Sequence, residues 1–185
     1  TRKKSSKKSF WTAKTMAVGA MCMALSSVLS LIKLWPMPMG GSVTPASMLP
    51  LLLFAYCYGV GPGMVLGALY GVMQFLLDGM AWAALGAIPN LLDYPIAFGL
   101  LGLAGCFRGS KAKMTAGFVL GCFGRFMASF LSGFIFYGQY APEGVNPVWY
   151  SLTYNGSYML VECIICIALG LLVGERLAKE LKKVA

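Results

Sequence analysis

Strongly polar side chains interrupt long apolar runs at five places in the chain: Asp78, Asp93, Arg125, Asn155 and Glu162. Each such group costs at least ~2.5 kcal/mol near the centre of a bilayer, so its side chain should face the protein interior, pair, or line a cavity. Asp93 and Asn155 open two of the runs, and Ser129 stands about two turns from the end of a third. We therefore expect these three side chains to converge on one site.

Arg125 and Ser129 are four residues apart and share one face of a helix. At about 1.5 Å per residue of helix, Arg125 lies roughly 18 Å before the C-terminal end of its apolar run, and Glu162 lies roughly 10 Å after the start of the next apolar run. We expect these two ends to lie on the same, outer side of a membrane. The two charges can pair if the arginine side chain extends. An ion pair that locks two helices is one interpretation, and direct contact with a ligand is the alternative.

The composition is that of an integral membrane protein. Of 185 residues, 58 % are hydrophobic and 11 % are charged, with a mean hydropathy of +0.74; an ordinary soluble domain has roughly 25 % charged residues. A helix needs about 20 apolar residues to cross a bilayer. We predict an all-α membrane protein, a single integral membrane domain over residues 1–185, with six transmembrane helices near residues 14–34, 46–60, 63–78, 91–107, 114–138 and 154–175.

The formal charge of +9 raises the possibility of a nucleic-acid partner, but the positions of the basic residues do not fit one. They cluster before the first run, between the fourth and fifth runs, and after the last run. Alternate loops of a six-helix protein face the same side, so this is the positive-inside pattern. It predicts both termini in the cytoplasm, with a basic tail over residues 1–13. The first run is longer than the roughly 7–15 residues of a signal peptide core, so we interpret it as a membrane helix.

The sequence lacks the usual residues of an enzyme site. It has no histidine, and its six cysteines all lie within apolar runs, so neither a zinc site nor a nucleophile beside a base can be assembled. We expect these cysteines to be small buried hydrophobic side chains. A membrane enzyme acting on lipids or isoprenoids is therefore the disfavoured alternative, and we expect no metal and no cofactor. Without a G-x-x-x-x-G-K-[ST] run, the chain has no ATP-binding motif of its own.

Three predicted outer loops, at 34–46, 79–90 and 139–153, hold most of the prolines and several tryptophans and tyrosines. Aromatic residues are common at membrane interfaces, but these loops are richer than connectors need and can roof a pocket. A carboxylate among aromatic rings, with few basic groups nearby, suits a planar heteroaromatic or cationic ligand. An anionic ligand would be poorly served.

Small residues recur at four-residue spacing, as Ala20 and Ala24, as Gly63, Gly67 and Gly71, and as Gly117 and Gly121. This spacing lets two helices approach closely within a membrane. Packing within the chain is the default interpretation. The alanine pair in the first helix suits a partner subunit equally well.

Five segments of the chain are distinctive: 37–44 (MPMGGSVT), 48–50 (MLP), 91–95 (LLDYP), 136–144 (FYGQYAPEG) and 150–158 (YSLTYNGSY). They resemble the ThiT family, the thiamine-specific S components of energy-coupling factor (ECF) vitamin importers. The last two are the most specific, and together the segments run from the first predicted helix to the last. The resemblance implies the ECF S-component fold of six helices, with a thiamine site near the outer face.

The resemblance also implies roles for particular residues. The residues that match thiamine contacts of the family are Asp93, Tyr94, Tyr137, Tyr150 and Asn155, with Trp82 a looser match. Ala20 and Ala24 match the small-residue motif that contacts the transmembrane coupling protein EcfT, which works with two ATP-binding cassette ATPases.

Ser129 departs from the pattern of the resemblance, because many family members carry histidine at its position. A serine is shorter and offers one hydroxyl, so a hydrogen bond to the ligand is lost or passes to water. The sequence therefore leaves two ligands open. One is thiamine, and the other is a thiamine precursor or another cationic heterocycle on the same fold.

Overall fold

The computed structural model describes residues 11–37, 41–78, 80, 83–84 and 86–184. Most of the predicted basic tail and Trp82 lie outside these residues. The described chain is a bundle of helices with one short antiparallel hairpin, in which Trp35 pairs with Val43 and Pro36 pairs with Ser42. In chain order the elements are α1 (Ala13–Leu31), β1 (Trp35–Pro36), β2 (Ser42–Val43), α2 (Leu49–Tyr58), α3 (Val60–Leu77), α4 (Ala87–Leu91), η2 (Leu92–Ile96), α5 (Ala97–Leu100), η3 (Leu101–Cys106), α6 (Lys111–Phe136), η4 (Gly138–Tyr140), α7 (Pro147–Leu169), η5 (Gly170–Gly174) and α8 (Glu175–Val184).

The membrane helices agree with the predicted fold class. Within the described residues, five helical stretches are long and apolar enough to cross a bilayer: Ala13–Leu31, Val60–Leu77, Ala87–Cys106, Lys111–Phe136 and Pro147–Lys183. The remaining predicted helix, at 46–60, corresponds to α2, which has only 10 residues. Every residue of α2 from Leu49 to Cys57 is buried, so protein rather than lipid surrounds it, as expected for a helix that is apolar on all sides.

Two predicted boundaries are wrong, for local reasons. The break predicted between the helices at 46–60 and 63–78 lies instead at Gly59, whose φ of 102° suits a residue without a side chain; α3 then begins at Val60. The last predicted helix, 154–175, begins earlier as α7, because the side chain of Asn146 accepts a hydrogen bond from Val148 N (2.9 Å) and Pro147 fits the first turn.

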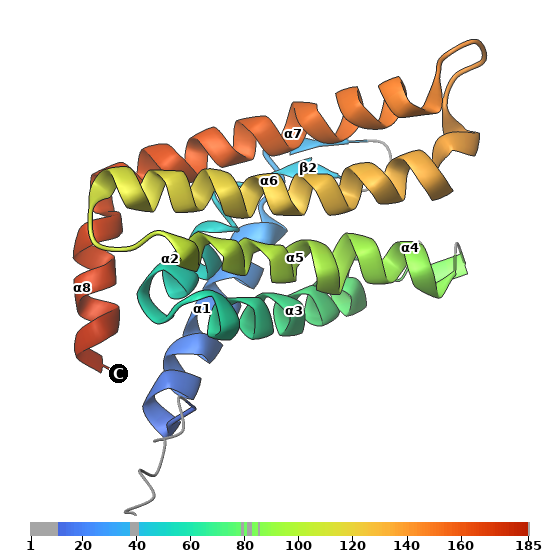
Figure 1. Cartoon of the computed structure of the whole chain (residues 1–185). Coiled ribbons are helices and arrows are strands. Elements are labelled where there is room, and N and C mark those ends of the chain that lie inside the picture. The colour runs from blue at the N-terminus through green and yellow to red at the C-terminus, as the bar shows by residue number, and fades with distance from the viewer. Residues whose placement is uncertain (1–10, 38–40, 79, 81–82, 85, 185) are drawn as a thin grey trace, which may run out of the picture.

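Figure 1 shows the long helices side by side in one succession: α7 lies beside α6, α6 lies beside the stretch from α4 to η3, and that stretch lies beside α3. The close approach of α3 to this stretch depends on glycines of α3. A Cβ added at Gly67 would lie 2.2 Å from Phe98 O, and one at Gly71 would lie 2.4 Å from Tyr94 O. The glycine spacing seen in the sequence therefore does bring two helix backbones together, within the chain.

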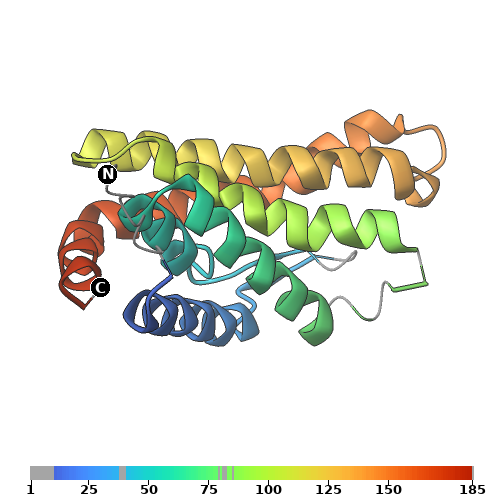
Figure 2. The same ribbon diagram turned by 60° about the horizontal axis from the view of Figure 1, so that its bottom comes forward.

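Basic segments gather at one end of the bundle, as the positive-inside pattern predicts. Tyr58 Oη in α2 donates to Leu181 O in α8 (2.7 Å). Gly109 N, in the loop before α6, donates to Tyr56 Oη in α2 (3.2 Å). Figure 2 places the start of α1 and the C-terminus at this same end. The loop between α6 and α7 lies at the opposite end. The Gly109 loop and α8 therefore share one side of the membrane.

The cysteines follow the prediction with one clear exception. Cys22, Cys57, Cys122 and Cys166 are buried, and Cys163 is half-buried. Cys106 is exposed, because it ends η3 at the edge of the bundle, where the chain turns toward Gly109.

Replacing Gly67 with alanine should loosen the contact between α3 and α5. The new methyl group meets the backbone of Phe98, so the change should cost about 1–3 kcal/mol of stability and lower the melting temperature of the purified protein in detergent. Gly61→Ala is the matched control, because nothing lies within 4 Å of its added Cβ. Equal melting temperatures for the two variants would contradict the close approach.

Candidate functional site

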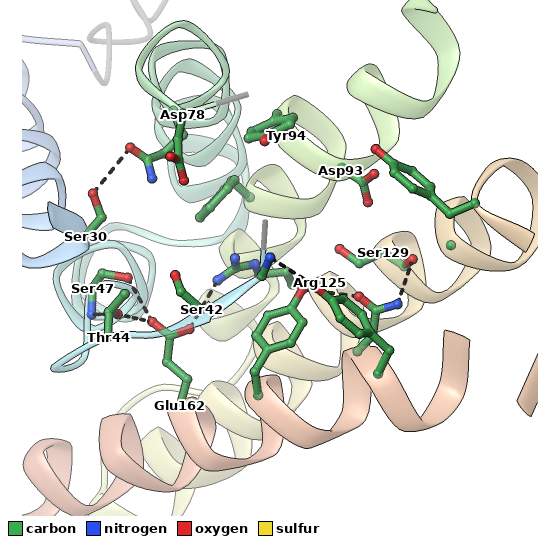
Figure 3. Close-up of a pocket in the computed structure, with 18 of the residues that line it drawn as sticks. Ser30, Ser42, Thr44, Ser47, Asp78, Asp93, Tyr94, Arg125, Ser129 and Glu162 are labelled. Carbon is green, nitrogen blue, oxygen red and sulfur yellow. Dashed lines mark hydrogen bonds and ion pairs between the residues drawn. The ribbon is translucent and has the colours of Figure 1, made fainter. Parts of the chain in front are cut away.

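A cavity lies within the helix bundle, toward the end opposite α8. Residues from α1, α3, η2, α5, α6, α7 and the segment after β1 line it (Figure 3). The lining residues are Ser30, Gly41, Ser42, Thr44, Ser47, Gln74, Asp78, Asp93, Tyr94, Phe98, Arg125, Ser129, Gly133, Tyr137, Tyr150, Ser151, Tyr154, Asn155, Tyr158 and Glu162. The three residues expected to converge, Asp93, Ser129 and Asn155, all lie on its wall.

Asp93 places a carboxylate on this wall from η2, a turn of wider helix that contains Pro95. Ser132 Oγ, fully buried on α6, donates to Asp93 Oδ2 (2.7 Å). The hydroxyl groups of Ser129 and Tyr137 lie close to this carboxyl group. Tyr137 lies just beyond α6, and burial together with the nearby Asp93 charge raises the pKa of its phenol. The phenol of Tyr137 therefore stays protonated.

Asn155 joins α7 to α6. Its Nδ2 donates to Ser129 O (3.3 Å) and to Ser151 O (3.1 Å), and Tyr158 Oη donates to its Oδ1 (3.2 Å). A Cβ at Gly133 would lie 2.4 Å from Ser151 Oγ and 3.0 Å from Asn155 Nδ2. The absence of a side chain at Gly133 is thus what lets the two helices meet at Asn155.

Tyrosines form the aromatic side of the cavity. Tyr150, Tyr154 and Tyr158 follow one another along α7, with ring centroids 6.1 Å and 5.9 Å apart. On the facing wall, Tyr94 packs edge-on against Phe75 at 5.5 Å. Gly41 N donates to Tyr154 Oη (3.2 Å), which fixes the hairpin segment over this row of rings.

The inner end of the cavity holds a charge pair. Glu162 is 1 % exposed, and its Oε2 lies 3.9 Å from Arg125 Nη1. Its Oε1 accepts hydrogen bonds from Ser47 Oγ (2.8 Å) and from Thr44 Oγ1. The ion pair considered from the sequence therefore exists. Both residues also line the cavity, so the two interpretations of this pair are compatible.

The segment from Ser42 to Ser47 enters the protein interior, which the sequence did not indicate. Its residues up to 46 were expected in an outer loop, yet Val43, Thr44 and Ala46 are buried, as is Ser47 after them. Its hydroxyl groups reach the Glu162 carboxylate on α7. The first outer loop is therefore a wall of the cavity and not only its roof.

Near the rim, α1 is joined to α3 by polar contacts. Lys33 Nζ pairs with Asp78 at 3.0 Å, and Ser30 Oγ donates to Gln74 Oε1 at 3.4 Å. Counting the described lining residues, the cavity carries the carboxylates Asp78, Asp93 and Glu162 and the guanidinium Arg125. Because carboxylates outnumber cationic groups, the cavity favours a positively charged ligand.

The structure brings together all but one of the ligand-site residues named from the sequence: Asp93, Tyr94, Ser129, Tyr137, Tyr150 and Asn155. The remaining one, Trp82, lies outside the described residues. Sequence reasoning missed Ser132, Tyr154, Tyr158 and Phe98. The spacing of Tyr150, Tyr154 and Tyr158, four residues apart, was a usable signal, because it puts all three rings on one helix face.

The sequence model of the family described as "Thiamine transporter protein (Thia_YuaJ)" matches residues 16–181. The chain belongs to this family. Two curated relatives, each named "Thiamine transporter ThiT", are similar to it. The one from Bacillus subtilis (strain 168) is 38 % identical over 144 residues, which is 70 % of this chain and 73 % of the relative. The one from Lacticaseibacillus paracasei is 33 % identical over 134 residues, covering 65 % and 67 %.

Solved structures of the thiamine transporter family and its relatives have the same fold. A structure of ThiT from Listeria monocytogenes matches with a TM-score of 0.79 at 21 % identity, covering 90 % of this chain and 96 % of that one. A structure described as the S component of a bacterial ECF transporter matches with a TM-score of 0.62 at 20 % identity, covering 91 % and 98 %. The chain is therefore a multi-pass membrane protein of a transporter family, which sets aside the lipid-modifying enzyme considered above.

Replacing Asn155 with alanine should separate α7 from α6. The change leaves the buried oxygen of Ser129 and the Tyr158 hydroxyl without this partner, at a cost of about 1–3 kcal/mol each. The melting temperature in detergent should fall. Thr153→Ala is the control, because the exposed Thr153 hydroxyl donates to carbonyl oxygens of its own helix, at Trp149 and Tyr150. An unchanged melting temperature for the Asn155 variant would show that this amide does not hold the helices together.

Proposed function

We propose that this protein binds thiamine at the outer face of the membrane and mediates its uptake as the substrate-binding (S) subunit of an ECF-type importer. The observation that carries the proposal is the Asp93 carboxylate. Ser132 holds it on a wall shared with a row of tyrosines, in a protein of the thiamine transporter family. A cationic heteroaromatic ligand meets both of its needs there, because the carboxylate attracts its charge and the tyrosine rings cover its faces.

Particular groups of thiamine suit particular residues. Its amino group can donate to Asp93, and its two rings can lie against Tyr94, Tyr137 and Tyr150. Ser129 contributes one hydroxyl, which lies near Asp93 on the same wall. Asn155 is hydrogen-bonded by protein groups on both ends of its amide, so its main part in the site is to shape the wall. Trp82 stays a predicted ring contact.

Transport needs an energy source that this chain does not contain, since its sequence has no ATP-binding motif. We propose that it works with the transmembrane coupling protein EcfT and two ATP-binding cassette ATPases. Ala20 and Ala24 support this proposal, because both are exposed on α1, where their small side chains let another helix approach closely.

Replacing Asp93 with asparagine should weaken thiamine binding by about tenfold or more, because the ligand loses an ionic partner that contributes roughly 1.5–3 kcal/mol. Isothermal titration calorimetry on the purified protein measures the dissociation constant. Glu143→Gln, which removes an exposed carboxylate of the outer loop, should leave the constant unchanged.

Two outcomes would overturn the ligand assignment. One is the absence of any saturable thiamine binding by the unchanged protein. The other is a thiamine precursor, such as the free aminopyrimidine alcohol, that displaces labelled thiamine at lower concentrations than thiamine itself. The second result would favour the precursor-specific alternative that Ser129 suggests.

Replacing Ala20 with tryptophan should prevent assembly with the coupling protein, because the bulky ring would hold the partner helix away from α1. Co-purification with the tagged coupling module measures assembly, and thiamine binding by the isolated subunit should not change. Leu160→Trp is the control, since Leu160 is 63 % exposed on α7. Normal assembly of the Ala20 variant would refute the proposed contact.

A further inference from the structure

An apolar groove lies outside the ligand cavity, between α1, α2, the end of α7 and α8. Seven of its eleven lining residues are leucines, and the other four are two prolines, an alanine and a cysteine. Leu25 on α1 is 53 % exposed and Leu177 on α8 is 44 % exposed. The groove is therefore open at the surface of the bundle, and its described lining carries no charged side chain.

The groove opens toward the cytoplasmic leaflet of the membrane. Figure 1 shows α8 turned across the end of the bundle, where Ala178 is buried and Tyr58 Oη donates to Leu181 O. Arg176 and Lys179 are exposed on the same helix. A helix with one apolar side and one basic side lies in the interface between acyl chains and water. The positive-inside pattern makes this interface the cytoplasmic one.

Lys14 and Arg176 bring positive charge to the cytoplasmic end of the groove. Lys14 precedes Leu25 by eleven residues, which is close to three turns, so the two lie on one face of α1 about 16 Å apart. Arg176 directly precedes Leu177 of the groove wall. Both basic residues are exposed, and neither forms an ion pair with any residue that the structure describes.

The acidic residues of α8 do not cancel this charge. The helix carries four basic residues against two acidic ones, Glu175 and Glu180. Glu180 is already paired with Lys183 Nζ at 2.6 Å. An anionic group at the cytoplasmic end of the groove therefore meets a net positive charge.

A phospholipid matches both parts of this surface. The hydrocarbon layer of one leaflet is about 15 Å thick, half of the roughly 30 Å of a bilayer, which agrees with the separation of Lys14 and Leu25 along α1. A helix of the coupling protein fits less well, because its proposed contacts Ala20 and Ala24 are not among the residues that line the groove.

We propose that this groove binds one phospholipid of the cytoplasmic leaflet that has an anionic headgroup. An acyl chain lies along Leu25, Leu29 and Leu53, and the headgroup lies at the level of Lys14 and Arg176. The lipid fills the space between α8 and the helices α1 and α2. This inference does not depend on thiamine being the ligand of the cavity.

The test compares two lipids with the same acyl chains, phosphatidylglycerol as the anionic probe and phosphatidylcholine as the zwitterionic one. Native mass spectrometry of the delipidated protein in detergent counts the lipids bound at each concentration. The first phosphatidylglycerol should bind with a dissociation constant at least about fivefold lower than the first phosphatidylcholine, the ratio that one basic residue near a membrane surface contributes. Equal dissociation constants would overturn the proposal.

A pair of variants tests the groove itself. Leu25→Trp should weaken the binding of both lipids at least about fivefold, because the indole ring takes the place of the acyl chain. Leu160→Trp is the control, since Leu160 is 63 % exposed on α7 and does not line the groove. Unchanged lipid binding by the Leu25 variant, together with loss of its co-purification with the coupling module, would assign the groove to that partner instead and overturn the proposal.

A second pair of variants tests the headgroup contact. Lys14→Gln combined with Arg176→Gln should reduce the preference for phosphatidylglycerol at least about fivefold and leave the binding of phosphatidylcholine unchanged. Lys111→Gln combined with Lys113→Gln is the control, because it removes the same charge from exposed positions of α6, which does not line the groove. An equal loss of preference in both double variants would show a general effect of charge and overturn the proposed site. If Leu25→Trp does not fold, this comparison still decides.

Discussion

A polar side chain within a bilayer must find its partner inside the protein, because lipid offers none. The bundle satisfies this constraint at its cavity. Glu162 on α7 is held by Thr44 and Ser47 and faces Arg125 on α6, and Asp93 in η2 is held by Ser132 on α6. These contacts join segments that are far apart in the sequence. The groups that are costly to bury are thus the same groups that position the helices around the site.

The glycines and the short helix α2 make this arrangement possible. Gly67 and Gly71 let α3 lie against the backbone that carries Asp93 and Tyr94, and Gly133 leaves room for Asn155. The buried α2 provides a solid core at one end of the bundle, and the cavity lies toward the other end. The other helices surround both. Binding and architecture therefore depend on the same close contacts between helices.

The sequence predicted the helices and much of the site for identifiable reasons. Long apolar runs and the placement of basic residues fix membrane helices and their direction, and the cost of burying Asp93 and Asn155 predicts that both face inward. The interior course of Ser42–Ser47 was not predictable, because short loop segments with serine and threonine look the same whether they cross the surface or enter the bundle. Ser132 was missed for a similar reason: a serine is tolerated on any helix face, and only the fold shows that it meets Asp93.

We propose that one cavity holds a flat cation between a carboxylate and a row of tyrosines. An experimental structure of the protein with thiamine bound tests this proposal most directly. It should show the aminopyrimidine ring beside Asp93 and the rings of Tyr94 and Tyr150 against the ligand. Thiamine bound outside this cavity, or bound within it with no polar contact to Asp93, would contradict the account.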